Sequence, residues 1–177
     1  AVRGVLQYMK MDCGIEIHHD GDLPARAGLG SSSAFTVGLL NATAALKGEM
    51  LTKMELTKEA IKIEQEMLEE NVGSQDQVMA AHGGFCRVDF STNHDIRVNP
   101  MIMNRERLNV FQNHLLLFFT GFSRTASEIA KEQIKKTNDR KSELKQMYQM
   151  VDEGISILTG QSNLDQFGLL LHENWKL

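Results

Sequence analysis

One stretch decides the fold: Pro24-Ala25-Arg26-Ala27-Gly28-Leu29-Gly30-Ser31-Ser32-Ser33-Ala34. The proline and the two glycines predict a loop, and apolar residues every three or four positions after Ser32 predict a helix that ends near Gly48. A glycine loop lets a ligand approach the backbone, and the first N–H groups of a helix lack internal partners. Together with the helix dipole, these features predict a site for a phosphate group.

Two common phosphate loops do not fit this stretch. The Walker loop requires a lysine that is absent, and the dinucleotide loop requires a third glycine where Ser33 stands. The hydroxyls of Ser31, Ser32 and Ser33 could bind phosphate oxygens or a Mg²⁺ ion. The alternative is a simple turn that caps the helix, because serine and glycine are common at helix starts.

Acidic residues supply the second group of candidates. Asp76 lies in a short predicted loop that begins at Gly73, where its carboxylate could accept a hydroxyl proton or hold a metal ion. Its alternative role is to cap the next helix. Glu64 and Glu66 lie on the preceding predicted helix, and most glutamates on helices are simply solvated.

The third candidate segment includes Gly121, Ser123 and Arg124, where a predicted buried strand runs into a helix. Ligand sites are frequent at strand ends, and Arg124 could bind a phosphate with two hydrogen bonds. A capped helix with a surface arginine is the alternative.

Composition excludes several classes of protein. The 177 residues are 42% apolar with a net charge of −4, which argues against disorder and against a generally basic nucleic-acid-binding surface. No apolar run is long enough to span a membrane. Cys13 and Cys86 lack partners at zinc-ligand spacing, which argues against a zinc site and a disulfide scaffold. Two free thiols in a chain with no signal peptide predict a reducing, cytoplasmic environment.

Hydrophobic periodicity predicts an α+β fold. Thr52 and Glu55 have the spacing of a capping box. Helices are predicted over residues 2–12, 32–48, 52–70, 78–81, 124–137, 140–159 and 163–176. Strands are predicted over residues 15–18, 85–90, 95–99 and 114–119, the second and third paired through the turn at 91–94.

The motif Pro24-x-x-x-Gly28-Leu29-Gly30-Ser31-Ser32-Ser33-Ala34 resembles the second signature motif of the GHMP small-molecule kinases. The segment Gly73-x-x-Asp76-Gln77 resembles the catalytic-aspartate loop of that family. Within it, Ile63–Glu66, Val72–Gln77, Phe118–Ser127 and Leu171–Leu177 are most similar to the bacterial D-glycero-D-manno-heptose phosphate kinases.

The resemblance implies a role for each matching residue. Gly28, Leu29, Gly30 and Ser31 to Ser33 would bind the phosphates of ATP. Ser32 and Glu64 would ligate Mg²⁺, with Glu66 not excluded because the spacing to the aspartate varies in the family. Asp76 would orient or deprotonate the sugar hydroxyl. Gly121, Ser123 and Arg124 are our weaker proposal for binding the sugar phosphate.

The implied reaction is transfer of the ATP γ-phosphoryl group to the anomeric hydroxyl of D-glycero-D-manno-heptose 7-phosphate, for nucleotide-heptose and surface polysaccharide synthesis. The alternatives are another sugar kinase of the family, acting on fucose or galactose, and a catalytically silent domain that binds a sugar or nucleotide. The expected small-molecule partner is a sugar phosphate, with no nucleic acid or membrane.

The resemblance also implies the GHMP kinase fold. Residues 1–105 would form the end of its N-terminal, ribosomal-protein-S5-like domain, which binds ATP, and residues 106–177 the start of its C-terminal, ferredoxin-like domain. The chain starts without Met inside a helical pattern and stops after an apolar stretch, so we expect it to be the central part of a longer kinase. Apolar faces left uncovered would then favour self-association.

Overall fold

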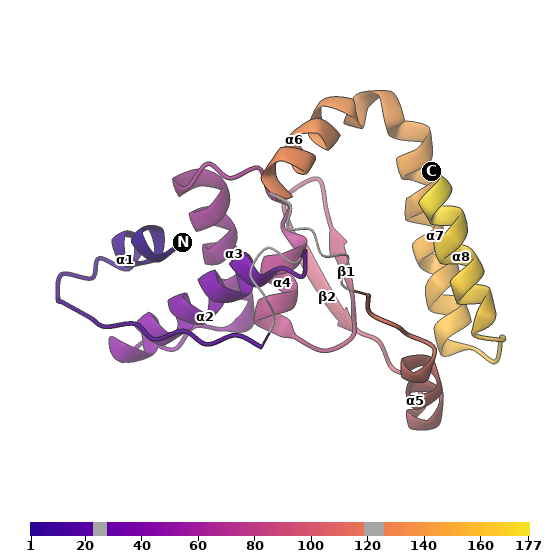
Figure 1. Cartoon of the computed structure of the whole chain (residues 1–177), viewed down its shortest axis with the longest axis horizontal. Helices are drawn as coiled ribbons and strands as arrows, with labels where there is room; N and C mark the ends of the chain where they lie inside the picture. The colour runs from indigo at the N-terminus through magenta and orange to yellow at the C-terminus, as the bar shows by residue number, and fades with distance from the viewer. Residues whose placement is uncertain (23–27, 119–125) are drawn as a thin grey trace. The chain divides into compact units, whose positions relative to one another are not determined.

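The computed structural model describes residues 1–22, 28–118 and 126–177. Of these, residues 1–22, 28–98 and 126–132 form one compact unit, and residues 99–118 and 133–177 form another. The structure is mostly helical with one small two-stranded sheet (Figure 1). The predicted domain boundary after residue 105 stays a prediction.

The elements follow in chain order. The first unit contains α1 (Val2–Tyr8), α2 (Ser31–Leu46), α3 (Lys53–Lys62), a π-helical turn (Ile63–Met67), α4 (Gln75–His82), β1 (Cys86–Phe90) and the start of β2 (Ile96–Pro100), which ends in the second unit. The helices that follow are α5 (Arg105–Asn113), α6 (Ala126–Lys136), a 3₁₀ turn (Thr137–Arg140), α7 (Lys141–Thr159) and α8 (Asp165–Lys176).

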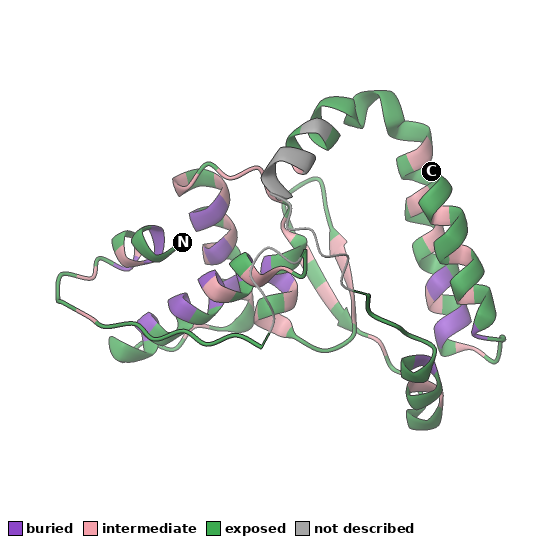
Figure 2. Cartoon of the chain, viewed as in Figure 1, coloured by how far each residue is buried: buried purple, intermediate pink, exposed green. Residues whose placement is uncertain are grey.

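The core of the first unit lies between α1, α2, α3 and the π-helical turn. Val5, Leu40, Ala60 and Ile63 are fully buried there, and Figure 2 shows the buried positions of α2, α3 and α4 as separate stripes on otherwise exposed helices. Along α2, the buried Val37, Leu40 and Ala44 recur at the three- and four-residue spacing that places side chains on one helix face. The apolar pattern of the sequence therefore selects which face of each helix packs inward.

Two of the local predictions are confirmed. The Thr52 hydroxyl accepts a hydrogen bond from the Glu55 backbone N–H (3.2 Å), and the Glu55 carboxylate accepts one from the Thr52 N–H (2.7 Å), which completes the capping box. Strands β1 and β2 pair through a tight turn in which the Ser91 N–H donates to the Asp95 carbonyl at 2.9 Å.

Two predicted strands are wrong in the described residues. Residues 15–18 are irregular, and residues 114–118 are an exposed irregular segment in which the Leu116 side chain is 80% accessible. A strand needs hydrogen-bonded neighbours, and the described residues supply only the β1–β2 pair. The prediction missed α5, which Asn104 caps by accepting a hydrogen bond from the Glu106 N–H.

The second unit is built around a small core of Phe111, Leu158 and Leu164. The rings of Phe111 and Phe167 meet edge to face at 5.5 Å between centroids. Arg107 on α5 donates hydrogen bonds to the carbonyls of Leu158, Ile157 and Ser162 at 2.6–2.7 Å. This guanidinium satisfies carbonyls at the end of α7 that the helix cannot satisfy itself.

In the part of the chain that the structure describes, no helix is both long enough and apolar enough to cross a membrane.

The imidazole of His82, in the last turn of α4, predicts a pH dependence of stability. Burial lowers the pKa of His82 below its ordinary value of 6.5, and nearby Lys53 lowers it further. Its Nε2 atom is buried without a hydrogen-bond partner among the described residues. The unfolded chain therefore binds this proton more readily than the folded chain does. Stability should be full above pH 6.5 and should fall as the pH drops through that value.

Melting temperature measured between pH 7.5 and pH 5 tests this expectation. The His82→Gln variant should show a flatter profile than the unchanged chain, whereas His172→Gln, at an exposed position on α8, should not. Equal slopes in the unchanged chain and in His82→Gln would exclude His82 as the cause.

Candidate active site

The amino end of α2 begins at the glycine loop. Gly30 is the N-cap residue and adopts a left-handed conformation with φ of 69°. The Ala34 N–H donates to the Gly30 carbonyl (2.9 Å), and no described side chain caps the helix. Ser31, Ser32 and Ser33 lie inside the first turn of the helix. The first N–H groups of a helix lack partners within it, so those of this turn can bind a ligand.

Asp76 lies directly against this loop. A Cβ atom built on Gly30 would be 3.1 Å from the Asp76 Cγ and 3.2 Å from its Oδ2. Asp76 is in the first turn of α4, whose N-cap residue is Ser74, and it is exposed. The alternative prediction, that Asp76 is the cap residue of this helix, is therefore wrong, because Ser74 occupies that position. The structure brings its carboxylate to the start of α2, although 46 positions separate it from Gly30 in the sequence.

Glu64 is buried beneath the same helix start, with only 1% of its surface exposed. Its Oε2 accepts hydrogen bonds from the Ser33 hydroxyl (2.8 Å) and from the Gln77 amide, and its Oε1 accepts one from the Thr36 hydroxyl (2.7 Å). Ser33 and Thr36 are three positions apart on α2 and so share a face. One carboxylate therefore connects α2, the π-helical turn and α4.

The local backbone explains why Glu64 reaches this position. The Leu68 N–H bonds the Ile63 carbonyl at 3.0 Å, five residues back, which is the pattern of a π-helix. Such single turns occur often at functional sites. Glu66, on the same turn, is exposed, so the structure distinguishes the two glutamates that the sequence left open.

The serine hydroxyl that contacts Glu64 is that of Ser33. Ser32, which the resemblance assigns to Mg²⁺ together with Glu64, is exposed, and its backbone carbonyl accepts a hydrogen bond from the Thr36 hydroxyl at 3.1 Å. Sequence reasoning missed Thr36 and the contact role of Gln77. The spacing of three between Ser33 and Thr36 is a signal that could have indicated Thr36.

A pocket of about 460 Å³ adjoins the loop. Ile17, Leu29, Phe35 and Leu39 give it apolar walls, and Ser31 lies at its edge. The rings of His19 and Phe35 meet edge to face, with centroids 4.8 Å apart. This pocket joins an apolar surface to the amino end of α2.

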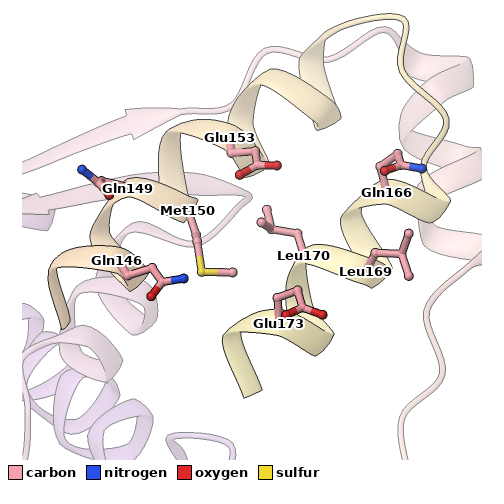
Figure 3. A pocket seen from close by; sticks show the side chains of 8 residues that line it. All are labelled: Gln146, Gln149, Met150, Glu153, Gln166, Leu169, Leu170 and Glu173. Atoms are coloured by element: carbon pink, nitrogen blue, oxygen red, sulfur yellow. The ribbon is translucent and has the colours of Figure 1, made fainter. Parts of the chain in front are cut away.

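The other candidate residues do not join this group. Gly121, Ser123 and Arg124 lie outside the described residues. A groove of about 380 Å³ between α7 and α8 contains no predicted site residue. Figure 3 shows Met150 and Leu170 pointing into the space between these helices, with Glu153 and Glu173 nearby.

An uncapped helix start beside an exposed carboxylate is a combination suited to phosphoryl transfer. The helix end attracts a phosphate, and the carboxylate can orient or deprotonate a hydroxyl that attacks it. These two features together suit a phosphate held beside an acceptor for a hydroxyl proton.

Comparison with known proteins agrees with this chemistry. Residues 1–84 match the model of the GHMP kinases N terminal domain, so this part of the chain is similar to that family. It is 31% identical to D-glycero-alpha-D-manno-heptose 7-phosphate kinase from Campylobacter jejuni, over 98% of this chain and 52% of that protein.

A solved structure is similar as well. The crystal structure of a D-glycero-D-manno-heptose 1-phosphate kinase from Bacteriodes thetaiotaomicron is 27% identical and has a TM-score of 0.72, covering 99% of this chain and 53% of that one. The chain thus spans about half the length of these two relatives. Their names place the phosphate at different positions of the heptose, so the names do not fix the substrate.

Substitution of Gly30 tests the contact between the loop and Asp76. Gly30→Ala should place a methyl group against the Asp76 carboxylate in a left-handed conformation that costs about 1–2 kcal/mol by itself. Gly28→Ala is the matched control, because Gly28 has a similar φ of 75° but no atom within 4 Å of the added Cβ. Binding of a non-hydrolysable ATP analogue, measured by calorimetry, should fall more in Gly30→Ala than in Gly28→Ala. Equal losses would mean that the Asp76 contact is unimportant.

Proposed function

We propose that the chain carries the phosphoryl-transfer site of an ATP-dependent kinase for D-glycero-D-manno-heptose 7-phosphate, acting on the anomeric hydroxyl. The observation that carries this proposal is the position of the Asp76 carboxylate against Gly30, at the uncapped start of α2. The substrate class is supported by the names of the two relatives described above.

The proposed role of each residue follows from its position in the site. The N–H groups of Ser31, Ser32 and Ser33 bind the ATP phosphates, helped by the positive end of the helix dipole. Asp76 accepts the proton of the anomeric hydroxyl while that oxygen forms a bond to the γ-phosphorus. The bond between the γ-phosphorus and the β–γ bridging oxygen breaks, and ADP leaves. The products are ADP and a heptose 1,7-bisphosphate for nucleotide-heptose and polysaccharide synthesis.

The oxygen donors at this site suit Mg²⁺, which proteins often bind through one or two carboxylates and the substrate phosphates. A carboxylate has about four lone-pair sites, and the donors to Glu64 use three of them. Among the described residues, no group of three or more acidic, histidine or cysteine side chains is arranged so that it could hold a metal ion by itself. Glu64 and Ser32 would hold the ion beside the phosphates, where it would neutralise phosphate charge.

Two further regions complete the proposal. The apolar pocket beside α2 accepts the nucleoside of ATP, since it begins at Leu29 and Ser31, next to the phosphate end. Arg124, with Gly121 and Ser123, binds the phosphate group of the sugar, because a guanidinium pairs with phosphate through two hydrogen bonds. The reaction takes place in the cytoplasm.

The sugar is tested with a substrate panel. Initial rates of ADP release with heptose 7-phosphate should exceed those with heptose 1-phosphate, fucose and galactose at equal concentration. A higher rate with fucose or galactose would change the substrate and keep the enzyme class. Saturable ligand binding with no ADP release from any sugar would favour the silent binding domain.

Replacement of Asp76 tests the mechanism. Asp76→Asn removes the proton acceptor and keeps the side-chain shape, so ADP release should fall by about 100-fold or more. The affinity for a non-hydrolysable ATP analogue should stay within about threefold, because the N–H groups that bind phosphate are unchanged. Asp12→Asn, an exposed position after α1, is the control and should have no effect. Unchanged turnover in Asp76→Asn would remove Asp76 from its role.

A further inference from the structure

The side chain of Gln77 is the feature that the proposed function does not yet use. It is fully buried, and its Nε2 donates to the Glu64 carboxylate. Its Oε1 is buried without a hydrogen-bond partner among the described residues. An unpaired buried acceptor costs about 1–3 kcal/mol. The amide therefore satisfies part of the buried charge of Glu64 while its own oxygen stays unpaired among the described residues.

Gln77 and Asp76 are consecutive residues in the first turn of α4. Successive side chains on a helix point about 100° apart. This rotation explains how Asp76 reaches the loop at Gly30 while Gln77 reaches the buried carboxylate of Glu64. Fixing the Gln77 side chain therefore fixes the rotation of the turn that carries Asp76.

The same carboxylate holds the opposite side of the site. Glu64 accepts from Ser33 and Thr36 on α2 while it accepts from Gln77 on α4. All three donors are neutral, so the contact depends on hydrogen bonding to a buried acceptor rather than on an ion pair. The hydrogen-bond path from Ser33 through Glu64 to Gln77 connects the phosphate-binding turn to the turn that carries Asp76.

We propose that Gln77 is the positioning residue for Asp76: its hydrogen bond to Glu64 sets the place of the aspartate relative to the start of α2. The catalytic part of this inference rests on the proposed function. Positioning matters for rate, because a displacement of about 1 Å at a reacting group can cost about 100-fold. Loss of the Gln77 contact should thus lower kcat more than it weakens ATP binding.

The first experiment measures hydrogen exchange of the amides of residues 78–82 in the full chain without ligand. Gln77→Met keeps the length of the side chain and removes the donor, so these amides should exchange about tenfold faster or more. Gln75→Met, at an exposed position of the same turn, is the matched control and should leave exchange unchanged. Equal protection in Gln77→Met and the unchanged chain would overturn the proposal.

The second experiment separates positioning from general destabilisation by kinetics. In Gln77→Met, kcat for ADP release should fall by about tenfold or more, while the KM for ATP stays within about threefold. A parallel loss of ATP affinity, or an unchanged kcat, would contradict a positioning role.

Absence of ADP release from a protein that carries this chain at the full length of its relatives would refute the proposed function, and the exchange experiment would still decide the positioning contact.

Discussion

The buried carboxylate of Glu64 is the constraint on which the site depends. A buried charged group is costly unless hydrogen bonds satisfy it, and this one accepts from Ser33, Thr36 and Gln77. Ser33 and Thr36 lie on α2, Gln77 lies on α4, and Glu64 itself lies on the π-helical turn. Hydrogen-bonding the charge therefore requires these three elements to adopt one arrangement. The need to hydrogen-bond the buried charge therefore fixes the backbone positions of these elements. The apolar core formed by residues of α2 and α3 stabilises the same arrangement.

Phosphoryl transfer depends mainly on positioning and on neutralising charge, and this arrangement serves both needs. Ser33 belongs to the turn whose N–H groups are open, and Gln77 follows the aspartate that lies against Gly30. The reacting groups can therefore stay exposed to ligands while the residues that fix them are buried. Gly30 has two reasons to be glycine, because its φ is positive and the Asp76 side chain occupies the space of a Cβ.

Sequence reasoning predicted the features that local rules determine. The capping box at Thr52, the β1–β2 hairpin and the start of α2 all follow from residue patterns within a few positions. The wrong strands at 15–18 and 114–118 depended on neighbours that the periodicity of a single segment does not specify. At the site, motif resemblance selected Asp76 and Glu64, whereas the contact between Glu64 and Ser33 depends on the rotation of α2. Thr36 and Gln77 act through a residue far away in the sequence, so no local pattern shows their partner.

One calorimetric titration tests the central claim most directly: a non-hydrolysable ATP analogue with Mg²⁺, added to the chain and to its Glu64→Ala variant. If the Glu64 hydrogen bonds form the phosphate site, the unchanged chain will bind at one saturable site, and Glu64→Ala will bind at least about tenfold more weakly while it remains folded. Equal affinity in a folded Glu64→Ala variant would contradict the claim that the buried carboxylate organises the site. The absence of saturable binding by the unchanged chain would contradict the nucleotide site itself.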